Sequence, residues 1–141
     1  MQRALQYIDD VKSGHVVTGK YLKLLVNRHV SDLKKSKEKA FPYYFDYDEA
    51  AHAVNAFSFF RLPTSKGGNA PFILMPYQAC ILFMAYGWRK KLNGKKRFRR
   101  VYLKVARGNA KTEFLVGVGT YEFAFSDADN PEVFWIATKK D

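Results

Sequence analysis

The sequence predicts an α/β protein in which amphipathic helices precede one βαβ unit of a parallel sheet. Two observations carry this prediction. Apolar residues recur at helical spacing through most of the N-terminal half. Further on, Val101–Val105 alternates as a strand would, and a polar turn and a second helical pattern follow it. Val133–Ala137 is then a continuous apolar run, as in a strand buried on both faces, and such a unit has a right-handed crossover.

The amino-acid composition limits the classes of protein to which the chain can belong. The chain has 141 residues, of which 48% are hydrophobic, so it can bury a core and is not disordered. A net charge of +11 favours a polyanionic partner such as nucleic acid, or an anionic membrane surface. The single cysteine, Cys80, excludes an internal disulfide and fits a reducing compartment. No signal peptide is expected, and the longest apolar run, Ala79–Tyr86, is too short to span a bilayer.

Helices are expected over Gln2–Ser13, over Thr18–Lys35 and from Asp46 to about Phe60. His29 falls on the apolar stripe of the second helix, and we interpret it as a packed histidine. Asp46 and Glu49 have the spacing of a capping box, which explains the local acid cluster more simply than paired catalytic carboxylates do. The lysines at positions 34, 35, 37 and 39 are interpreted as a solvated helix end, with a DNA contact as the alternative.

A fourth helix is expected to begin near Pro76, since proline suits the first turn of a helix. Before it, Leu62–Ala70 is expected to be a loop. The helix is apolar nearly all round through Trp88, which predicts that it is buried. Gln78 is its polar exception. The Gln78 amide has two interpretations: it bonds the local backbone, or it reads an adenine edge with one acceptor and two donors.

The segment Arg89–Arg100 contains eight basic residues and no acid. Asn93-Gly94 within it is a turn signal, so two basic arms are expected to form an exposed hairpin or loop. We interpret it as a contact to a phosphate backbone rather than a solvated connection. The predicted DNA-binding residues are Arg89, Lys90, Lys91, Lys95, Lys96, Arg97, Arg99 and Arg100.

The turn Ala106–Thr112 lies where the strand pattern changes to the helix pattern, which is the geometry of a phosphate-binding loop. The match to G-x-x-x-x-G-K-[ST] is incomplete, because Val105 and Ala110 occupy the glycine positions. A basic turn that only caps a helix is the alternative reading of the loop alone.

Taken in order, these segments resemble a known family. The segments are Phe72–Gln78 (FILMPYQ), Gly87-Trp88, Ala106–Thr112 (ARGNAKT) and Ala137–Asp141 (ATKKD). Their order and spacing resemble the N-terminal part of the ATPase domain of the large terminase subunit of tailed bacteriophages, of the HK97-like type. The resemblance extends over essentially the whole chain and is more specific than the loop alone.

The resemblance implies a RecA-like P-loop ATPase that drives DNA into a prohead, with ATP and Mg²⁺ as cofactors. Lys111 would contact the β- and γ-phosphates, Thr112 would ligate Mg²⁺, and Gln78 and Tyr77 would hold the adenine. The implied nucleotide-binding residues are Tyr77, Gln78, Arg107, Gly108, Asn109, Ala110, Lys111 and Thr112. The implied partners are double-stranded DNA, the portal, the small terminase subunit and further copies of the chain, in the host cell cytoplasm.

Residues 1–70 are expected to form a helical N-terminal region and residues 71–141 the start of the ATPase domain. The rest of that domain and the nuclease domain would lie beyond residue 141, so the chain is expected to be an incomplete domain. It contains no candidate for the Walker B acid and glutamate, and we expect it to be inactive alone. Two alternatives stay open: a small basic DNA-binding module without a nucleotide site, or a piece of another P-loop ATPase such as a helicase.

Overall fold

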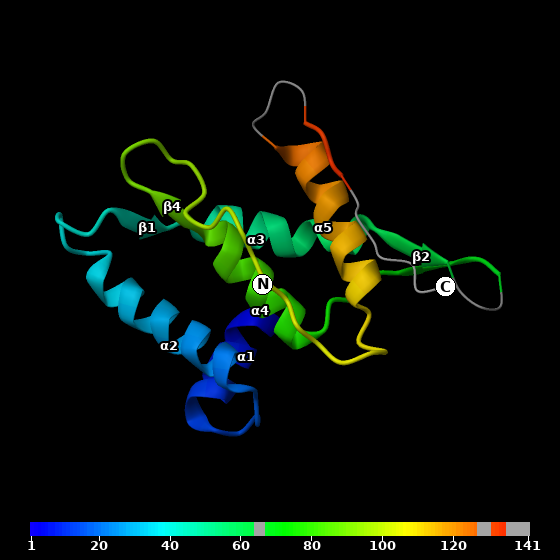
Figure 1. Cartoon of the computed structure of the whole chain (residues 1–141), viewed down its shortest axis with the longest axis horizontal. Helices are drawn as coiled ribbons and strands as arrows, with labels where there is room; N and C mark the ends of the chain where they lie inside the picture. Colours follow the sequence, from blue (N-terminus) through cyan, green and yellow to red (C-terminus); the bar gives the residue numbers. More distant parts are fainter. Residues whose placement is uncertain (64–66, 127–130, 135–141) are drawn as a thin grey trace. The chain divides into compact units, whose positions relative to one another are not determined.

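Helix α4 (Pro76–Gly87) is the centre of the first part of the chain, and it packs against α3 (Tyr47–Ala56) and α1 (Gln2–Ser13) in the computed structural model (Figure 1). Eight of its residues are buried, as expected from its uniformly apolar sequence. Pro76 occupies its first turn, as predicted. The helix ends at Gly87, and Trp88 begins a strand instead of extending the helix.

The structure describes residues 1–63, 67–126 and 131–134. The chain divides into two compact units, Met1–Lys104 and Val105–Asp141, and each is considered by itself. The first unit also contains α2 (Lys20–Lys35), β1 (Tyr43–Phe45), the 3₁₀ helix η1 (Phe57–Phe59), β2 (Arg61–Pro63), β3 (Asn69–Pro71) and β4 (Trp88–Lys90), and the second contains α5 (Lys111–Phe125). The predicted domain boundary at residue 70 stays a prediction.

The N-terminal helices confirm the helical periodicity. Helix α1 ends at Gly14, whose φ of 81° places it in the left-handed region that suits glycine at a helix C-terminus. Helix α3 is capped by the Asp46 carboxylate, which accepts from the backbone N–H groups of Asp48 and Glu49 at 3.1 Å each. The capping-box prediction is wrong in its second half, since the Asp46 N–H donates to the Gly87 carbonyl at 2.7 Å. The Glu49 side chain pairs with Arg89 instead.

Both sheets in the described part of the chain are two-stranded and antiparallel. Strand β1 pairs with β4, with Tyr44 opposite Arg89, and β2 pairs with β3. The predicted loop over residues 62–70 therefore includes strand residues at both of its ends. Helices and strands are mixed along the chain, which is consistent with the predicted α/β class.

The predicted strand Val101–Val105 is not formed, because within the described residues no segment pairs with it and residues 101–106 have no regular structure. A strand exists only through hydrogen bonds to a neighbour, and alternation of side chains cannot provide one. Of the predicted strand Val133–Ala137, residues 133 and 134 also have no regular structure, and residues 135–137 lie outside the described residues.

An aromatic cluster joins α2, α4 and the β1–β4 sheet. The Phe45 ring lies 4.9 Å from His29, 5.0 Å from Phe83 and 5.3 Å from Trp88, measured between ring centroids. The indole Nε1–H of Trp88 donates to Nδ1 of His29 at 3.1 Å, which requires that this imidazole nitrogen carry no proton. His29 is 4% exposed, so the prediction of a packed histidine is confirmed.

Burial lowers the pKa of His29 from 6.5 to about 4, and the nearby Asp32 carboxylate opposes this only in part. The unfolded chain therefore takes up this proton first as the pH falls. The stabilisation is complete above pH 6.5 and is lost as the pH falls towards 4. We expect the free energy of unfolding to be about 2 kcal/mol lower at pH 5 than at pH 7 through this group.

Urea unfolding at both pH values measures this difference. The matched variant is His29→Gln, which keeps an acceptor for Trp88 but does not titrate, and its unfolding free energy should vary less between the two values. An equal pH dependence in both proteins would contradict the assignment to His29.

Candidate functional site

The predicted phosphate loop forms a turn over Arg107 and Gly108 that leads directly into α5. Gly108 has a φ of 85°, a conformation that glycine adopts without strain. The side-chain amide of Asn109 donates to the Ala106 carbonyl at 3.1 Å, which closes the turn. The loop is thus a defined turn before a helix, as the sequence predicted.

The N-terminus of α5 is open. Among the described residues no side chain caps this helix, and Lys111, Thr112 and Glu113 in its first turn are exposed. The first backbone N–H groups of a helix have no partner inside the helix, and the helix dipole adds positive potential there. A phosphate group and its Mg²⁺ ion therefore fit the residues present: unpartnered N–H groups, a lysine ammonium and a threonine hydroxyl.

Ala110 precedes α5 in the left-handed conformation, with φ 48° and ψ 35°, and among the described residues it is the only non-glycine residue with positive φ. It occupies the position that holds the second glycine of G-x-x-x-x-G-K-[ST]. The backbone therefore adopts a glycine-type conformation at this position although the residue is alanine. An alanine there costs about 1 kcal/mol relative to a conformation that it prefers.

We expect Ala110→Gly to stabilise the turn and the first turn of α5 by up to about 1 kcal/mol, because glycine removes the left-handed strain at some cost in chain entropy. Amide hydrogen exchange over residues 108–115 measures the effect. Gly108→Ala is the matched opposite change, since a Cβ there meets nothing within 4 Å and only the φ of +85° is strained. Faster exchange in Ala110→Gly than in the parent would contradict the prediction.

The predicted adenine residues lie at the start of α4. Gln78 is fully buried, and its Oε1 accepts from the backbone N–H of Met75 at 2.9 Å. Its Nε2 lies 3.4 Å from the Tyr77 hydroxyl. The structure thus places Gln78 in the backbone-capping arrangement, and its contact with a base stays a prediction.

The basic segment confirms the turn at Asn93-Gly94, where Gly94 has a φ of 66°. The chain returns from this turn so that the backbone N–H of Arg97 donates to the Trp88 carbonyl at 2.9 Å. The backbones of Arg89 and Lys96 form an isolated antiparallel β-bridge. We refer to residues 88–100 as the basic hairpin. It belongs to the first unit, as does every partner described for it below.

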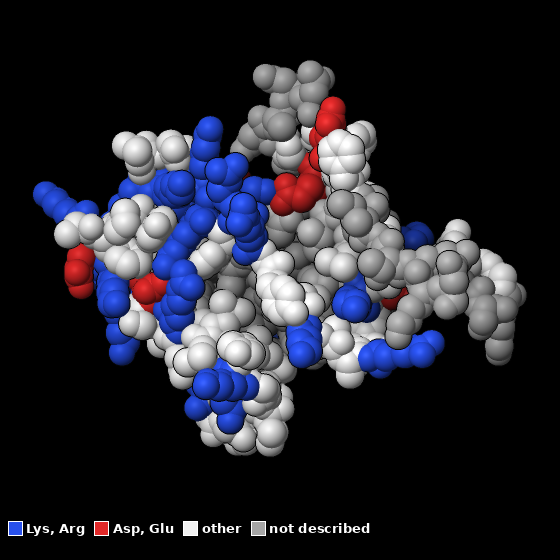
Figure 2. Space-filling view, in the orientation of Figure 1, with Lys and Arg blue, Asp and Glu red and all other residues white. Residues whose placement is uncertain are grey.

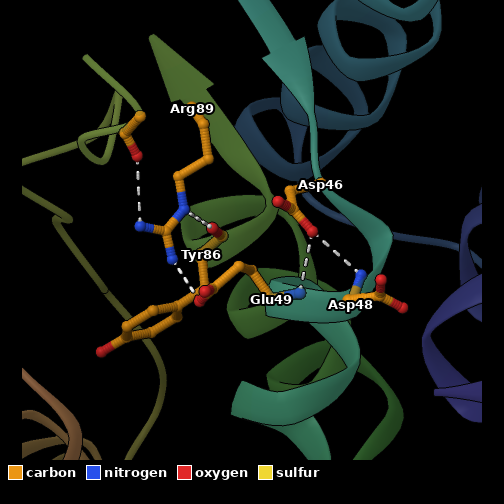
Figure 3. Close-up of polar contacts among 6 residues, drawn as sticks. Asp46, Asp48, Glu49, Tyr86 and Arg89 are labelled. Carbon is orange, nitrogen blue, oxygen red and sulfur yellow. Dashed lines mark hydrogen bonds and ion pairs between the residues drawn. The ribbon is translucent and has the colours of Figure 1, made fainter.

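Arg89 is buried rather than displayed, being 7% exposed. Its guanidinium donates to the Tyr86 carbonyl at 3.2 Å and to the Gly94 carbonyl at 3.4 Å, and it forms an ion pair with Glu49 (Figure 3). The contact anchors the hairpin to the end of α4 and the start of α3. Glu49 is a partner that the sequence analysis had assigned to the helix cap alone.

Arg97 is the second anchor. Its guanidinium lies 2.8 Å from the Asp32 carboxylate of α2, and it lies over the Tyr43 ring at 4.2 Å and the Trp88 ring at 5.1 Å. Lys91 donates to carbonyls, as described below, and Lys96 lies 5.1 Å from the Tyr86 ring. The eight predicted DNA-binding residues therefore fall into an inner set with protein partners and an outer set that includes Lys90, Lys95, Arg99 and Arg100.

Burial raises the pKa of the Cys80 thiol to about 12, so it is not a nucleophile at neutral pH. The described residues contain no group of three or more His, Cys, Asp or Glu that could hold a metal ion. None of the described helices has the length and apolar character needed to cross a membrane.

Residues 76–141 match the family model for the terminase large subunit, ATPase domain. The match begins at the first residue of α4 and includes the basic hairpin, the phosphate loop and α5. No curated protein and no solved structure matches the chain.

The turn at Arg107 and Gly108 and the open N-terminus of α5 both lie within this match. Residues 76–141 are thus similar to the ATPase domain of the terminase large subunit. The resemblance predicted from the sequence is confirmed for these residues.

Proposed function

We propose that the chain binds Mg·ATP as the N-terminal ATP-binding portion of a motor that packages viral DNA. The observation that carries this proposal is the open N-terminus of α5, preceded by Ala110 in a glycine-type conformation and carrying Lys111 and Thr112 in its first turn. The family match supports it, since it covers this segment. A RecA-like parallel sheet is proposed for the ATPase domain as a whole, although residues 101–106 form no strand in the described part of this chain.

Each loop residue has a role in this proposal. Backbone N–H groups of Gly108–Thr112 surround the phosphates, and the Lys111 ammonium neutralises charge on the β- and γ-oxygens. Arg107 adds a second cation, and the Thr112 hydroxyl binds Mg²⁺. Bound Mg²⁺ supplies charge neutralisation between the phosphates. Tyr77 and Gln78 are proposed for the base, which requires Gln78 to exchange its bond with Met75 for one with adenine.

The proposed site residues account for binding and not for turnover. Phosphoryl transfer to water also needs a carboxylate or amide that orients the attacking water, and none of the proposed site residues supplies it. We therefore expect this chain to bind nucleotide without appreciable hydrolysis. Double-stranded DNA, the portal, the small subunit and further copies of the chain are the proposed partners, and the host cytoplasm is the proposed location.

Lys111→Ala should weaken Mg·ATP binding by about a hundredfold, because the ammonium would form charge-assisted contacts with the phosphate oxygens. Isothermal titration calorimetry measures the dissociation constant. Lys104→Ala removes an exposed lysine outside the loop and should leave binding unchanged. Equal losses in both variants would mean that general charge, and not the loop, attracts the nucleotide.

A second candidate function is a basic DNA-binding module without a nucleotide site. The charge of +11 and the outer cations of the hairpin favour it. It predicts salt-dependent duplex binding by a chain that shows no calorimetric signal with Mg·ATP. The proposed function predicts both kinds of binding.

A further inference from the structure

We propose that the C-terminal end of α2 and the basic hairpin form one surface for the phosphate backbone of duplex DNA, and that Arg97 is the positioning residue that holds its two halves together. From the sequence alone, the lysines at positions 34, 35, 37 and 39 are interpreted as a solvated helix end, with a DNA contact as the alternative. The inference rests on the proposed role on DNA and is independent of the phosphate loop.

The two basic segments are joined by direct bonds. The Lys91 ammonium donates to the carbonyls of Ser36 at 3.0 Å and Glu38 at 2.8 Å, just beyond the end of α2. The Lys91 N–H donates to the Pro42 carbonyl at 2.9 Å. The hairpin turn is thereby fixed beside the lysine-rich segment, although the two are distant in sequence.

Arg97 makes the second connection, and its surroundings show that it does not serve as a phosphate contact itself. The side chain is 11% exposed, its charge is balanced by Asp32, and its planar guanidinium lies among the rings of Tyr43, Trp88 and Phe98. Arg28 of α2 repeats this arrangement, since it lies 4.9 Å from the Phe98 ring and 3.7 Å from the Asp32 carboxylate. Residues 97 and 98 of the basic hairpin are thus held against α2.

The remaining cations face outward on both segments. Lys34, Lys35, Lys37 and Lys39 are exposed, as are Lys95, Arg99 and Arg100 of the basic hairpin, and Lys90 is half-buried. Figure 2 shows Lys and Arg side chains gathered in a band over the region where α2 and the turn after β4 lie in Figure 1. Within these two segments Glu38 is the one acid, so the potential is strongly positive.

A duplex fits this surface better than an acidic protein does. Protein interfaces have an apolar centre, whereas residues 34–39 and 90–100 expose one large apolar side chain, Leu92. Duplex DNA offers about one negative charge per 1.7 Å of its axis, and such a regular charge suits a surface of separate long cations. Binding of this kind is independent of sequence and is weakened by salt.

Fluorescence anisotropy with a labelled duplex of about two helical turns tests the joint surface, without nucleotide and over a range of salt. One variant carries Lys34, Lys35, Lys37 and Lys39→Gln, and another carries Lys90, Lys95, Arg99 and Arg100→Gln. Each should lose at least tenfold in affinity and flatten the slope of log K against log salt by about 3. The control carries the same number of changes at the exposed residues Lys12, Lys20, Lys23 and Arg61.

The control should bind within about twofold of the parent, because the first lysines of α2 lie about 20 Å from its last ones. If the α2-end variant behaves like the control, the joint surface is wrong. If polyglutamate displaces the duplex as well as unlabelled duplex does, an acidic protein is the better partner and the proposal fails. Lys111→Ala should bind DNA like the parent, which separates this test from that of the nucleotide site.

Asp32→Asn tests the positioning role of Arg97. The change raises the net charge, so a purely electrostatic surface would bind DNA more tightly. If Arg97 positions the hairpin, losing its partner weakens binding about fivefold or more in a chain whose melting shows that it is folded. Arg97→Lys should also weaken binding although the charge is kept, whereas Arg99→Lys should not. Tighter binding by Asp32→Asn would overturn the positioning role.

Discussion

Arg89→Ala should lower the free energy of unfolding by roughly 2–4 kcal/mol, because the guanidinium is a buried anchor although its Glu49 partner is 45% exposed. The guanidinium is 7% exposed and joins three segments through the Tyr86 and Gly94 carbonyls and the Glu49 carboxylate. Its removal leaves two carbonyls short of a donor and a cavity beside α4. Thermal and urea unfolding followed by circular dichroism measure the loss.

The control lies in the same basic hairpin. Arg99→Ala removes an exposed arginine and should change the free energy of unfolding by less than about 0.5 kcal/mol. Glu49→Ala should be costly because it leaves the Arg89 charge without its carboxylate, and adding Arg89→Met should recover part of that loss. Similar stabilities for the Arg89 and Arg99 variants would show that the anchor does not contribute.

The helices could be predicted because their signals are local. These signals are the helical spacing of apolar residues, Pro76 in a first turn, Gly14 at a helix end and Asp46 as a cap. Each acts within a few residues, and each is found in the structure. The strand predicted over Val101–Val105 failed because strand formation is not local. Alternation of apolar residues indicates on which face each side chain would lie, but a strand also needs a second strand to pair with, and this stretch of sequence does not specify one.

The eight basic residues of the hairpin show why charge alone does not define a binding surface. Arginine and lysine read alike along the sequence, but Arg89 and Arg97 have carboxylate partners on helices far back in the chain. The signal that could have separated them is the guanidinium itself, which pairs and stacks where lysine does not. Glu49 was placed at the correct helix end, and its distant partner could not be seen from spacing.

The predicted phosphate loop departs from the pattern G-x-x-x-x-G-K-[ST] but keeps a glycine-type backbone conformation at Ala110. A strict pattern fails at Ala110, yet the backbone there is left-handed, the conformation for which glycine is favoured. What the pattern encodes is the turn geometry, and the sequence around Gly108 and Asn109 specifies that turn with an alanine in place of the glycine.

Gly87→Ala should lower the free energy of unfolding by at least about 3 kcal/mol, because a side chain at this position overfills the core. A Cβ there would lie 2.4 Å from Cζ of Phe45 and 2.9 Å from Cβ of Ala50. Phe45 is the central ring of the aromatic cluster, so it cannot move aside without displacing His29 and Trp88. The glycine of the Gly87-Trp88 pair, one of the segments of the family resemblance, is thus required here by close packing against Phe45.

A double-mutant cycle distinguishes this overlap from a general effect on helix α4. Phe45→Ala alone creates a cavity and should cost roughly 3–5 kcal/mol, but it removes the atoms that the new methyl group would meet. The double variant should therefore be less destabilised than the two losses added together, with a coupling of about 1 kcal/mol or more. Gly19→Ala is the matched glycine control, since a Cβ there meets nothing within 4 Å and its φ is −64°. Additive losses at Gly87 and Phe45 would mean that Gly87 is required for some reason other than the close approach of the Phe45 ring.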